Sequence, residues 1–280
     1  MTVNVKAAHE QQSCFVDIVV DGRDVRIEYA LIEAAEGSAA PLLVFLHEGL
    51  GSVSMWRDFP WMLCAATGMR GMMYSRPGYG RSTPPAPDER WPVDFMQRQA
   101  QVVLPALLDT LAIDAPVWLF GHSDGGSIAL LFAAAYPTRT LGLVVVAPHI
   151  VVEEISIASI EAARRHYDVR AFKARLARYH DDPDSAFRGW SDVWLDPAFR
   201  DWTIEADVAR ITCPLLAVQG TGDEYGTMAQ VDGISSRAFQ SCVVKLDGAG
   251  HSPHRDQPEQ LIAAVVAFLR AHGGTSEHGC

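Results

Sequence analysis

The fold of this chain is decided by residues 116–132, which read PVWLFGHSDGGSIALLF. An uninterrupted apolar run comes first, as in a strand buried on both faces, and a helical pattern follows the glycines. Between them lies Gly121-His122-Ser123-Asp124-Gly125, which fits the pattern G-x-S-x-G. In this setting the pattern indicates a strained turn that exposes a serine hydroxyl, with glycines where any side chain would collide. We therefore expect Ser123 to be a nucleophile, whereas a glycine-rich turn capped by Ser123 is the structural alternative.

Outside this stretch the chain repeats the order of strand, loop and helix. Continuous apolar runs, rather than alternating ones, predict an α/β fold with a mostly parallel sheet covered by helices. The turn Asp21-Gly22 between two β-rich runs predicts an opening hairpin, and Pro105 is expected to kink or restart a helix. The predicted strands are 14–20, 24–32, 41–47, 69–75, 116–121, 141–147, 213–219 and 242–246, and the predicted helices are 55–67, 93–111, 123–136 and 259–270.

The alternation lapses between residues 150 and 209, where short helical patterns and many aromatic residues occur. A chain of 280 residues is long for one simple domain and short for two, so one core domain with an insertion fits best. We read 150–209 as a helical cap, with 1–149 and 210–272 as the two parts of the core. Residues 273–280 are expected to be a disordered tail.

Aromatic residues are the main feature of the predicted cap. About half of them must form the cap's own small core, and the others are expected to face a pocket. The candidates for substrate contact are Trp190, Trp194 and Trp202. The basic side chains at positions 164, 165, 170, 173, 175 and 178 are expected to form a solvated helix face.

A serine hydroxyl is too weakly acidic to attack unaided, so a base and a group that orients this base must lie elsewhere in the chain. His251 follows the strand 242–246, and Asp223 follows the strand 213–219. Ligand sites of parallel sheets form at the carboxyl ends of strands, so we expect His251 as the base and Asp223 as its partner. The rivals of Asp223 are its neighbour Glu224 and the pair Glu153 and Glu154.

A tetrahedral intermediate also needs donors for its negatively charged oxygen. We expect the backbone N–H groups of Asp124 and Gly49 to supply them, and Glu48 lies beside this loop as a further candidate for substrate contact. The side chain of Asp124 has three options: the free N–H groups of its own helix, an ion pair with Arg76 or Arg81, or a cationic amine on the substrate.

These elements, in this order, resemble the α/β-hydrolase superfamily over about residues 14–271. The run Arg76-Pro77-Gly78-Tyr79-Gly80-Arg81-Ser82 is similar to the D-x-x-G-x-G-x-S loop of that family, with Ser75 where the family usually has aspartate. The resemblance implies an eight-stranded sheet, a lid between strands six and seven, and a triad of Ser123, Asp223 and His251. Ser123-Asp124-Gly125-Gly126 looks like the biphenyl hydrolase-like branch, which would favour α-amino esters.

Composition limits the partners of the chain. A net charge of −11 and a pI of about 5.3 argue against nucleic acid and anionic membranes, so a small-molecule substrate is expected. We expect no metal and no cofactor, and a homodimer is compatible with the sequence. The five cysteines are expected to be reduced and mostly buried, and with no signal peptide or apolar span we predict a cytoplasmic protein.

The triad alone does not choose the bond that is cleaved. In this fold, haloalkane dehalogenases and epoxide hydrolases use aspartate at the position of Ser123, so the serine argues against both. Hydrolysis of a carboxylic ester or lactone is the expected reaction. The alternatives are hydrolysis of a carbon–carbon bond in a ring-cleavage product, and a small-molecule receptor or signalling protein that retains the triad.

Overall fold

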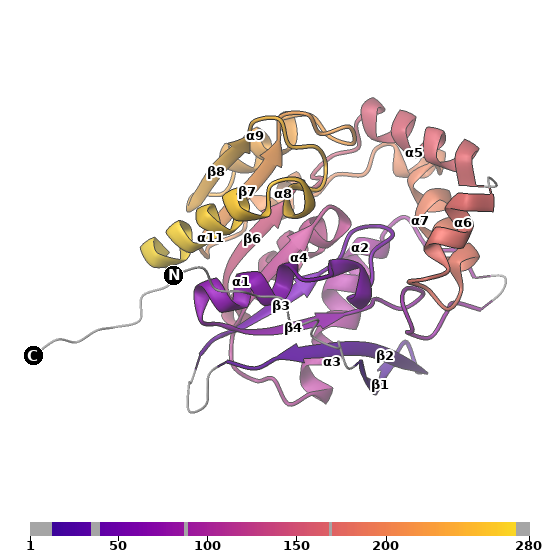
Figure 1. The fold of residues 1–280 in the computed structure, drawn as a ribbon, viewed down its shortest axis with the longest axis horizontal. Coiled ribbons are helices and arrows are strands. Elements are labelled where there is room, and N and C mark those ends of the chain that lie inside the picture. The colour runs from indigo at the N-terminus through magenta and orange to yellow at the C-terminus, as the bar shows by residue number, and fades with distance from the viewer. Residues whose placement is uncertain (1–12, 35–39, 87–88, 168–169, 273–280) are drawn as a thin grey trace, which may run out of the picture.

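The computed structural model describes residues 13–34, 40–86, 89–167 and 170–272. Its frame is an eight-stranded sheet with the strand order β1-β2-β4-β3-β5-β6-β7-β8 (Figure 1). β1 and β2 form an antiparallel hairpin, β2 is also antiparallel to β4, and every other pairing is parallel. The sheet is therefore the mostly parallel one that the apolar runs predict. The tail 273–280, expected to be disordered, lies outside the described residues.

The strands lie close to their predicted positions. Asp21 and Gly22 both have positive φ angles, as a two-residue hairpin turn requires. Leu42–Leu46, Val117–His122 and Leu215–Gly220 are buried at every position, because helices cover both faces of the sheet. The strands are β1 (Cys14–Val20), β2 (Arg23–Ile32), β3 (Leu42–Leu46), β4 (Arg70–Tyr74), β5 (Val117–His122), β6 (Thr140–Val146), β7 (Leu215–Gly220) and β8 (Ser241–Leu246).

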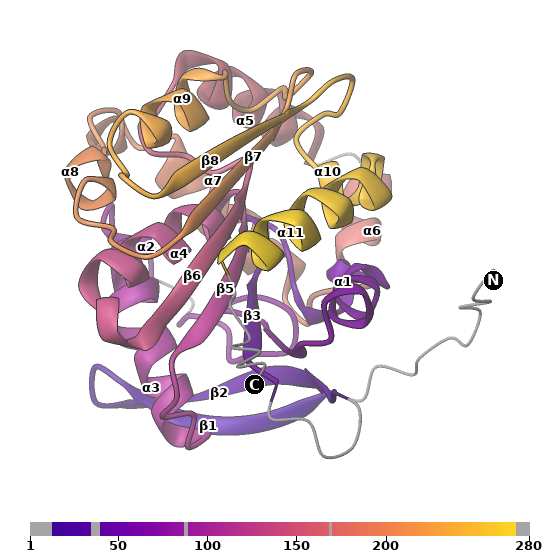
Figure 2. The ribbon, with the colours of Figure 1, turned by 90° about the vertical axis from the view of Figure 1, so that its left-hand side faces the viewer.

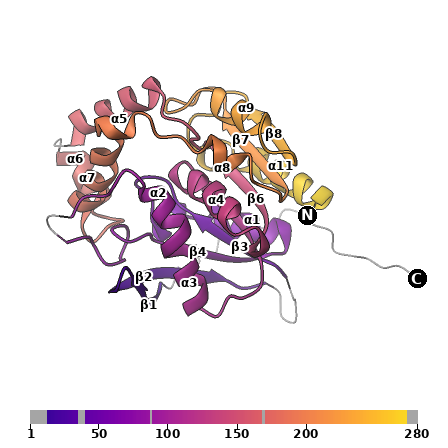
Figure 3. The same ribbon diagram turned by 180° about the vertical axis from the view of Figure 1, so that it is seen from behind.

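The core of the protein lies in two layers, one on each face of the sheet. On one face, α1 (Phe59–Thr67) and α11 (Pro258–His272) pack against the strands (Figure 2). The other face is covered by α2 (Phe95–Arg98), α3 (Leu104–Thr110) and α4 (Asp124–Ala135), which Figure 3 shows from the opposite side. α9 (Ala229–Ser235) adds to this second layer. Burial of these apolar helix faces holds the strand ends in fixed positions.

Two predicted helices differ in detail from the structure, and proline is part of the reason in both. The segment expected as one helix at 55–67 is a 3-10 turn, Val53–Trp56, followed by α1, with Arg57 at a φ of 53° between them and Pro60 in the first turn of α1. The segment 93–111 is α2, a π-helical turn at Gln99–Val103, and then α3, which has Pro105 in its first turn. Proline has no N–H to donate, so helices restart where it stands.

A helical insertion lies between β6 and β7. It contains α5 (Glu154–Tyr167), α6 (Arg170–Leu176) and α7 (Pro183–Trp194), which form one group to the side of the sheet in Figure 1. A single antiparallel bridge, between Val151 and Thr203, joins the two chain segments that enter and leave this group. α8 (Glu205–Val208) packs instead on α4 and α9. The structure therefore places the end of the predicted cap, at residue 209, inside the core layer.

Four cysteines lie in the described part of the chain, and all four are free thiols. Cys64 is buried, but Cys14 and Cys242 are exposed, against the expectation that these thiols would be buried. Both stand in edge strands of the sheet, where one side of the strand has no neighbour. Within the described ranges, no helix is both long and apolar enough to cross a membrane.

Candidate active site

Ser123 stands at the sharp turn between β5 and α4. Its φ and ψ angles are 54° and −122°, a strained conformation that a packed surrounding must hold in place. The backbone passes so close to β3 that a Cβ atom on Gly125 would lie 2.1 Å from the carbonyl oxygen of Leu46. A Cβ on Gly121 would lie 2.2 Å from the carbonyl oxygen of Gly125. Glycine is therefore required at both positions of the G-x-S-x-G pattern.

The structure brings Ser123, His251 and Asp223 into one hydrogen-bonded chain. His251 Nε2 lies 2.9 Å from Ser123 Oγ, and His251 Nδ1 lies 2.8 Å from Asp223 Oδ1. The N–H of Tyr225 donates to the same carboxylate oxygen at 2.8 Å. Burial opposes ionisation of Asp223, but the hydrogen bond and charge of His251 and the N–H of Tyr225 hold its pKa below the ordinary value. A carboxylate in this state can fix the tautomer of His251.

The rival acids have other partners. Glu224 accepts a hydrogen bond from the backbone N–H of His251 at 3.1 Å, not from its ring. Glu153 accepts from the N–H of Thr227 and from the side chain of Gln230, and Glu154 pairs with Arg200. Among the described residues, Asp223 is thus the only carboxylate of the four candidates that contacts the His251 imidazole.

The loop after β3 lies against the turn at Ser123. In the part of the chain that the structure describes, the N–H groups of Gly49 and Asp124 have no protein acceptor, so both are free to bind a ligand oxygen. A Cβ atom on Gly49 would lie 2.3 Å from the indole ring of Trp190. Trp190 belongs to α7, so the insertion packs directly on the backbone of this loop.

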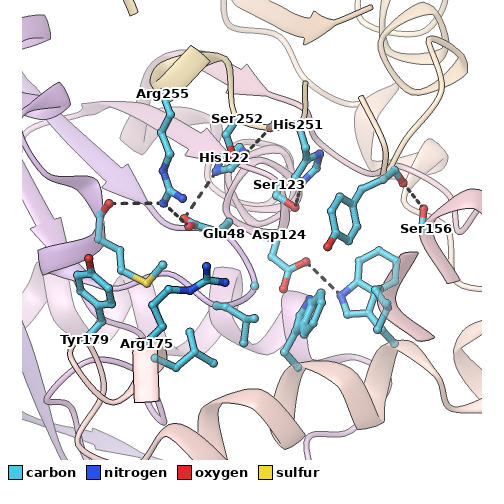
Figure 4. Close-up of a pocket in the computed structure, with 18 of the residues that line it drawn as sticks. Glu48, His122, Ser123, Asp124, Ser156, Arg175, Tyr179, His251, Ser252 and Arg255 are labelled. Carbon is cyan, nitrogen blue, oxygen red and sulfur yellow. Dashed lines mark hydrogen bonds and ion pairs between the residues drawn. The ribbon is translucent and has the colours of Figure 1, made fainter. Parts of the chain in front are cut away.

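Asp124 has an ion-pair partner beneath the site. Its carboxylate lies 3.7 Å from Arg76 Nη2. It also accepts a hydrogen bond from Trp194 Nε1 at 3.2 Å, the dashed line at Asp124 in Figure 4. Burial raises the pKa of Asp124, and the charge of Arg76 and the Trp194 bond oppose that shift. Of the three options for this side chain, the geometry agrees with the ion pair to Arg76. Arg81 instead lies over the ring of Phe15.

Glu48 carries a second carboxylate at the site, and its charge is also balanced. Arg255 donates to Glu48 Oε1 at 2.9 Å, and His122 Nδ1 lies 3.6 Å from Glu48 Oε2 (Figure 4). Burial opposes ionisation, but the contact and charge of His122 and the charge of Arg255 hold the pKa of Glu48 well below its ordinary value. His122 Nε2 also bonds to the carbonyl oxygen of His251 at 2.8 Å, so this cluster supports the loop of the imidazole.

A cavity of about 440 Å³ opens over Ser123 between the core and the insertion. This volume suits a small organic ligand. Of the predicted substrate contacts, Glu48, Trp190 and Trp194 line the cavity. Trp202 does not, because it stacks on Phe199 at a ring-centroid distance of 5.2 Å. The prediction for Trp202 is therefore wrong in position, since sequence alone cannot tell which face of the insertion an aromatic residue occupies.

The sequence did not predict several of the residues that line the cavity. His149 lies in the loop after β6, with its ring 4.9 Å from that of Trp194, and burial lowers its pKa to about 3. The ring of Tyr225 lies 4.8 Å from that of His251. Arg175 and Arg178, expected on a solvated helix face, are exposed and also line the cavity. The position of His149 just after a strand could have predicted that it lines the cavity. No sequence pattern predicts the same of Arg175 and Arg178.

The loop at residues 75–82 is held by a carboxylate from a different strand than the family pattern implies. Glu28 on β2 is buried and accepts hydrogen bonds from Ser75 Oγ at 2.7 Å and from the N–H of Arg81 at 3.0 Å. Ser75 Oγ in turn accepts from the N–H of Val53. Glu28 thus supplies the negative charge that Ser75 lacks, and the serine bridges it to the neighbouring loop.

No cluster of three or more histidine, cysteine or acidic side chains that could hold a metal ion occurs among residues 13–34, 40–86, 89–167 and 170–272. The polar groups that line the cavity are those of three serines, three histidines, two tyrosines, two carboxylates and four arginines. Such groups can transfer protons and bind charged or carbonyl oxygen atoms.

Comparison with known proteins agrees with this geometry. A family model described as "Alpha/beta hydrolase family" matches residues 43–265. A monoglyceride lipase from Mus musculus is 28% identical over 194 residues, which are 60% of this chain and 62% of the lipase, so the match spans less than two thirds of that relative. The protein named serine hydrolase BPHL from Homo sapiens is 30% identical over 206 residues, 69% of this chain and 67% of that protein.

The fold also matches solved structures. That of the enol-lactonase from Burkholderia xenovorans LB400 has a TM-score of 0.70 with 21% sequence identity, and the match covers 91% of this chain and all of the other. At this identity the likeness concerns the fold alone.

Proposed function

Because the chain belongs to the alpha/beta hydrolase family, we propose that this hydrolase cleaves a small carboxylic ester or lactone with Ser123 as its nucleophile. The observation that carries the proposal is the chain of hydrogen bonds from Asp223 through His251 to Ser123, at the floor of a ligand-sized cavity. The match to a monoglyceride lipase, whose name denotes an ester substrate, supports this choice of bond.

In the proposed mechanism, His251 Nε2 takes the proton of Ser123 as its oxygen attacks the carbonyl carbon of the substrate. Asp223 holds Nδ1–H and stabilises the imidazolium that forms. The free N–H groups of Gly49 and Asp124 donate to the oxyanion, and His251 then gives the proton to the leaving alcohol. Water, activated by the same imidazole, attacks the acyl-enzyme ester and releases the acid.

The two carboxylates near the proposed oxyanion site would repel it if they were unpaired. Arg255 pairs with Glu48, and Arg76 lies beside Asp124. Both arginines therefore offset a negative charge that would otherwise raise the barrier. We also propose that the insertion, with α5, α6 and α7, acts as the cap that shapes the substrate pocket through Trp190 and Trp194.

The test is turnover of a panel of short p-nitrophenyl esters and lactones, with Ser123→Ala beside the wild type. We expect multiple turnovers in the wild type and a loss of several orders of magnitude in kcat for the variant, because a triad acts as a unit. A fluorophosphonate label should attach at Ser123. A single-turnover burst would point to a receptor. Hydrolysis of a coloured ring-cleavage dienone acid, without ester turnover, would point to carbon–carbon cleavage.

A further inference from the structure

The wall of the cavity carries more positive than negative charge. Four arginines line it, namely Arg57, Arg175, Arg178 and Arg255. Among the described residues, Arg255 pairs with Glu48, whereas Arg57, Arg175 and Arg178 have no carboxylate within ion-pair distance. Glu48 and Asp124 are the two carboxylates of the lining, and each already has an arginine of its own. Three guanidinium groups are therefore left without a protein counter-ion.

The position of Arg175 distinguishes it from an ordinary surface arginine. On the same helix, α6, Lys173 forms an ion pair with Asp184 and does not line the cavity. Figure 4 shows the guanidinium of Arg175 pointing into the pocket, across from His251. Among the described side chains of α6, Lys173 is thus neutralised outside the cavity, whereas Arg175 is directed inward with no carboxylate within ion-pair distance.

The surroundings of these arginines are partly apolar. Ile160, Phe172 and Leu176 line the same cavity, and the guanidinium of Arg175 lies 5.2 Å from the ring centre of Phe172. The three arginines are exposed to solvent, and the apolar walls beside them strengthen their attraction for an anion that binds against these walls. The whole chain carries a net charge of −11, so this group of arginines forms a local positive charge on a negatively charged protein.

We propose that Arg175, with Arg178 and Arg57, forms a subsite for an anionic group of the substrate. The substrate is then an ester or lactone that carries a carboxylate or a phosphate away from its scissile carbonyl, with an apolar linker between the two. A guanidinium offers two parallel donors to either anion. This inference rests on the proposed function, since it takes Ser123 as the place where the carbonyl binds.

The test compares three methyl esters of similar length: methyl hydrogen adipate, its analogue with a phosphate in place of the carboxylate, and neutral methyl hexanoate. We expect kcat/KM at low salt to be about ten- to a hundredfold higher for one or both anionic esters, which is the range of a charge-assisted contact. The preference should shrink as sodium chloride is added. The arm with the larger preference identifies the anion.

Arg175→Gln should lower kcat/KM for the preferred anionic ester about tenfold more than for methyl hexanoate, mainly through KM. Arg175→Lys should keep part of the preference because it keeps the charge. Lys173→Gln is the matched control, since it removes one positive charge from the same helix outside the cavity, and it should leave the ratio unchanged. If the ratio of kcat/KM between the anionic ester and methyl hexanoate were equal in wild type and Arg175→Gln, with ester turnover intact, the subsite would be overturned. The proposed ester hydrolysis would still stand.

Binding to the Ser123→Ala variant separates the two proposals. Calorimetric titration with methyl hydrogen adipate and with methyl hexanoate should show tighter binding of the anion, and the added Arg175→Gln change should abolish that difference. Charge-selective binding without any turnover in the wild type would defeat the proposed hydrolysis while the subsite stands. Equal binding of both esters would defeat the subsite itself.

Discussion

The sheet with its strand-end loops and the β6–β7 insertion both border the same cavity, but they contribute different kinds of residue. Ser123, Asp223 and His251 come from loops after β5, β7 and β8, where packed strands fix the backbone. Trp190, Trp194 and Arg175 come from short helices of the insertion, and each contributes through the direction of a side chain. The residues proposed for catalysis thus come from the rigid region, whereas the insertion adds aromatic side chains and two of the four arginines of the pocket.

The largest expected effect falls in the sheet region. Asp223→Asn should lower kcat by about 10³-fold or more, because the His251 imidazole loses the partner that fixes its tautomer and stabilises its charge. Glu153→Gln is the control, since its hydrogen bonds reach Thr227 and Gln230 instead of the imidazole. Steady-state kinetics on the best ester would check both. A crippled Glu153→Gln beside an active Asp223→Asn would move the acid to the loop after β6.

The next largest effect on kcat is expected at the contact between the loop after β3 and the insertion. Gly49→Ala places a methyl group where the Trp190 ring stands, 2.3 Å from the new Cβ, so either the loop or the indole must move. We expect kcat to fall about 10²-fold, at the low end of the range for loss of one oxyanion donor. Trp190→Ala alone is the matched control. The double variant should recover much of the lost kcat, and additive losses instead would show that the two regions are not coupled here.

The insertion should control substrate preference more than rate. Trp190→Ala and Trp194→Ala are expected to change the ratio of kcat/KM between short and long acyl chains about tenfold, because both side chains line the cavity. Trp202→Ala removes a buried tryptophan that stacks on Phe199 outside it. It should lower Tm without changing the ratio. A changed ratio in Trp202→Ala would mean that the preference reflects loosening of the whole insertion.

The smallest effect concerns acid stability of the sheet region. His254 lies among the rings of Trp56, Phe59 and His122, and burial holds its pKa well below the ordinary value. The unfolded chain then binds a proton that the folded one does not, so stability is lost as the pH falls below about 6.5. His254→Phe should reduce this loss by about 1 kcal/mol per pH unit.

Denaturant unfolding between pH 7 and pH 5 measures this slope. His166→Phe, at an exposed position of α5, is the matched variant and should leave the slope nearly unchanged. If both variants changed it equally, the acid sensitivity would not come from the buried ring.

Individual residues show how much of the fold and of the candidate site the sequence predicts. The continuous apolar runs predicted the inner strands within a few residues, because burial on both faces leaves a pattern that local sequence carries, and the Asp21-Gly22 turn predicted the opening hairpin. The positions of Ser123, Asp223 and His251 at strand ends predicted their proximity, since parallel strands end at one edge of a sheet. The structure brings the three within hydrogen-bond distance. Helix breaks near Arg57 and the π-helical turn before Pro105 were only partly predictable, because packing selects among several local conformations.

Sequence by itself therefore determined the sheet, the strained turn at Ser123 and the order of the residues proposed for catalysis. Only the tertiary structure decided that Asp124 faces Arg76, that Glu28 replaces the carboxylate missing at Ser75, and that Arg175 points inward. It also decided that Trp202 lies away from the cavity. The physical reason is how far apart in the sequence the interacting residues lie. Strand and turn patterns depend on neighbouring residues. The partner of a charged group, or the direction in which an aromatic ring points, depends on elements that come into contact only after the chain has folded.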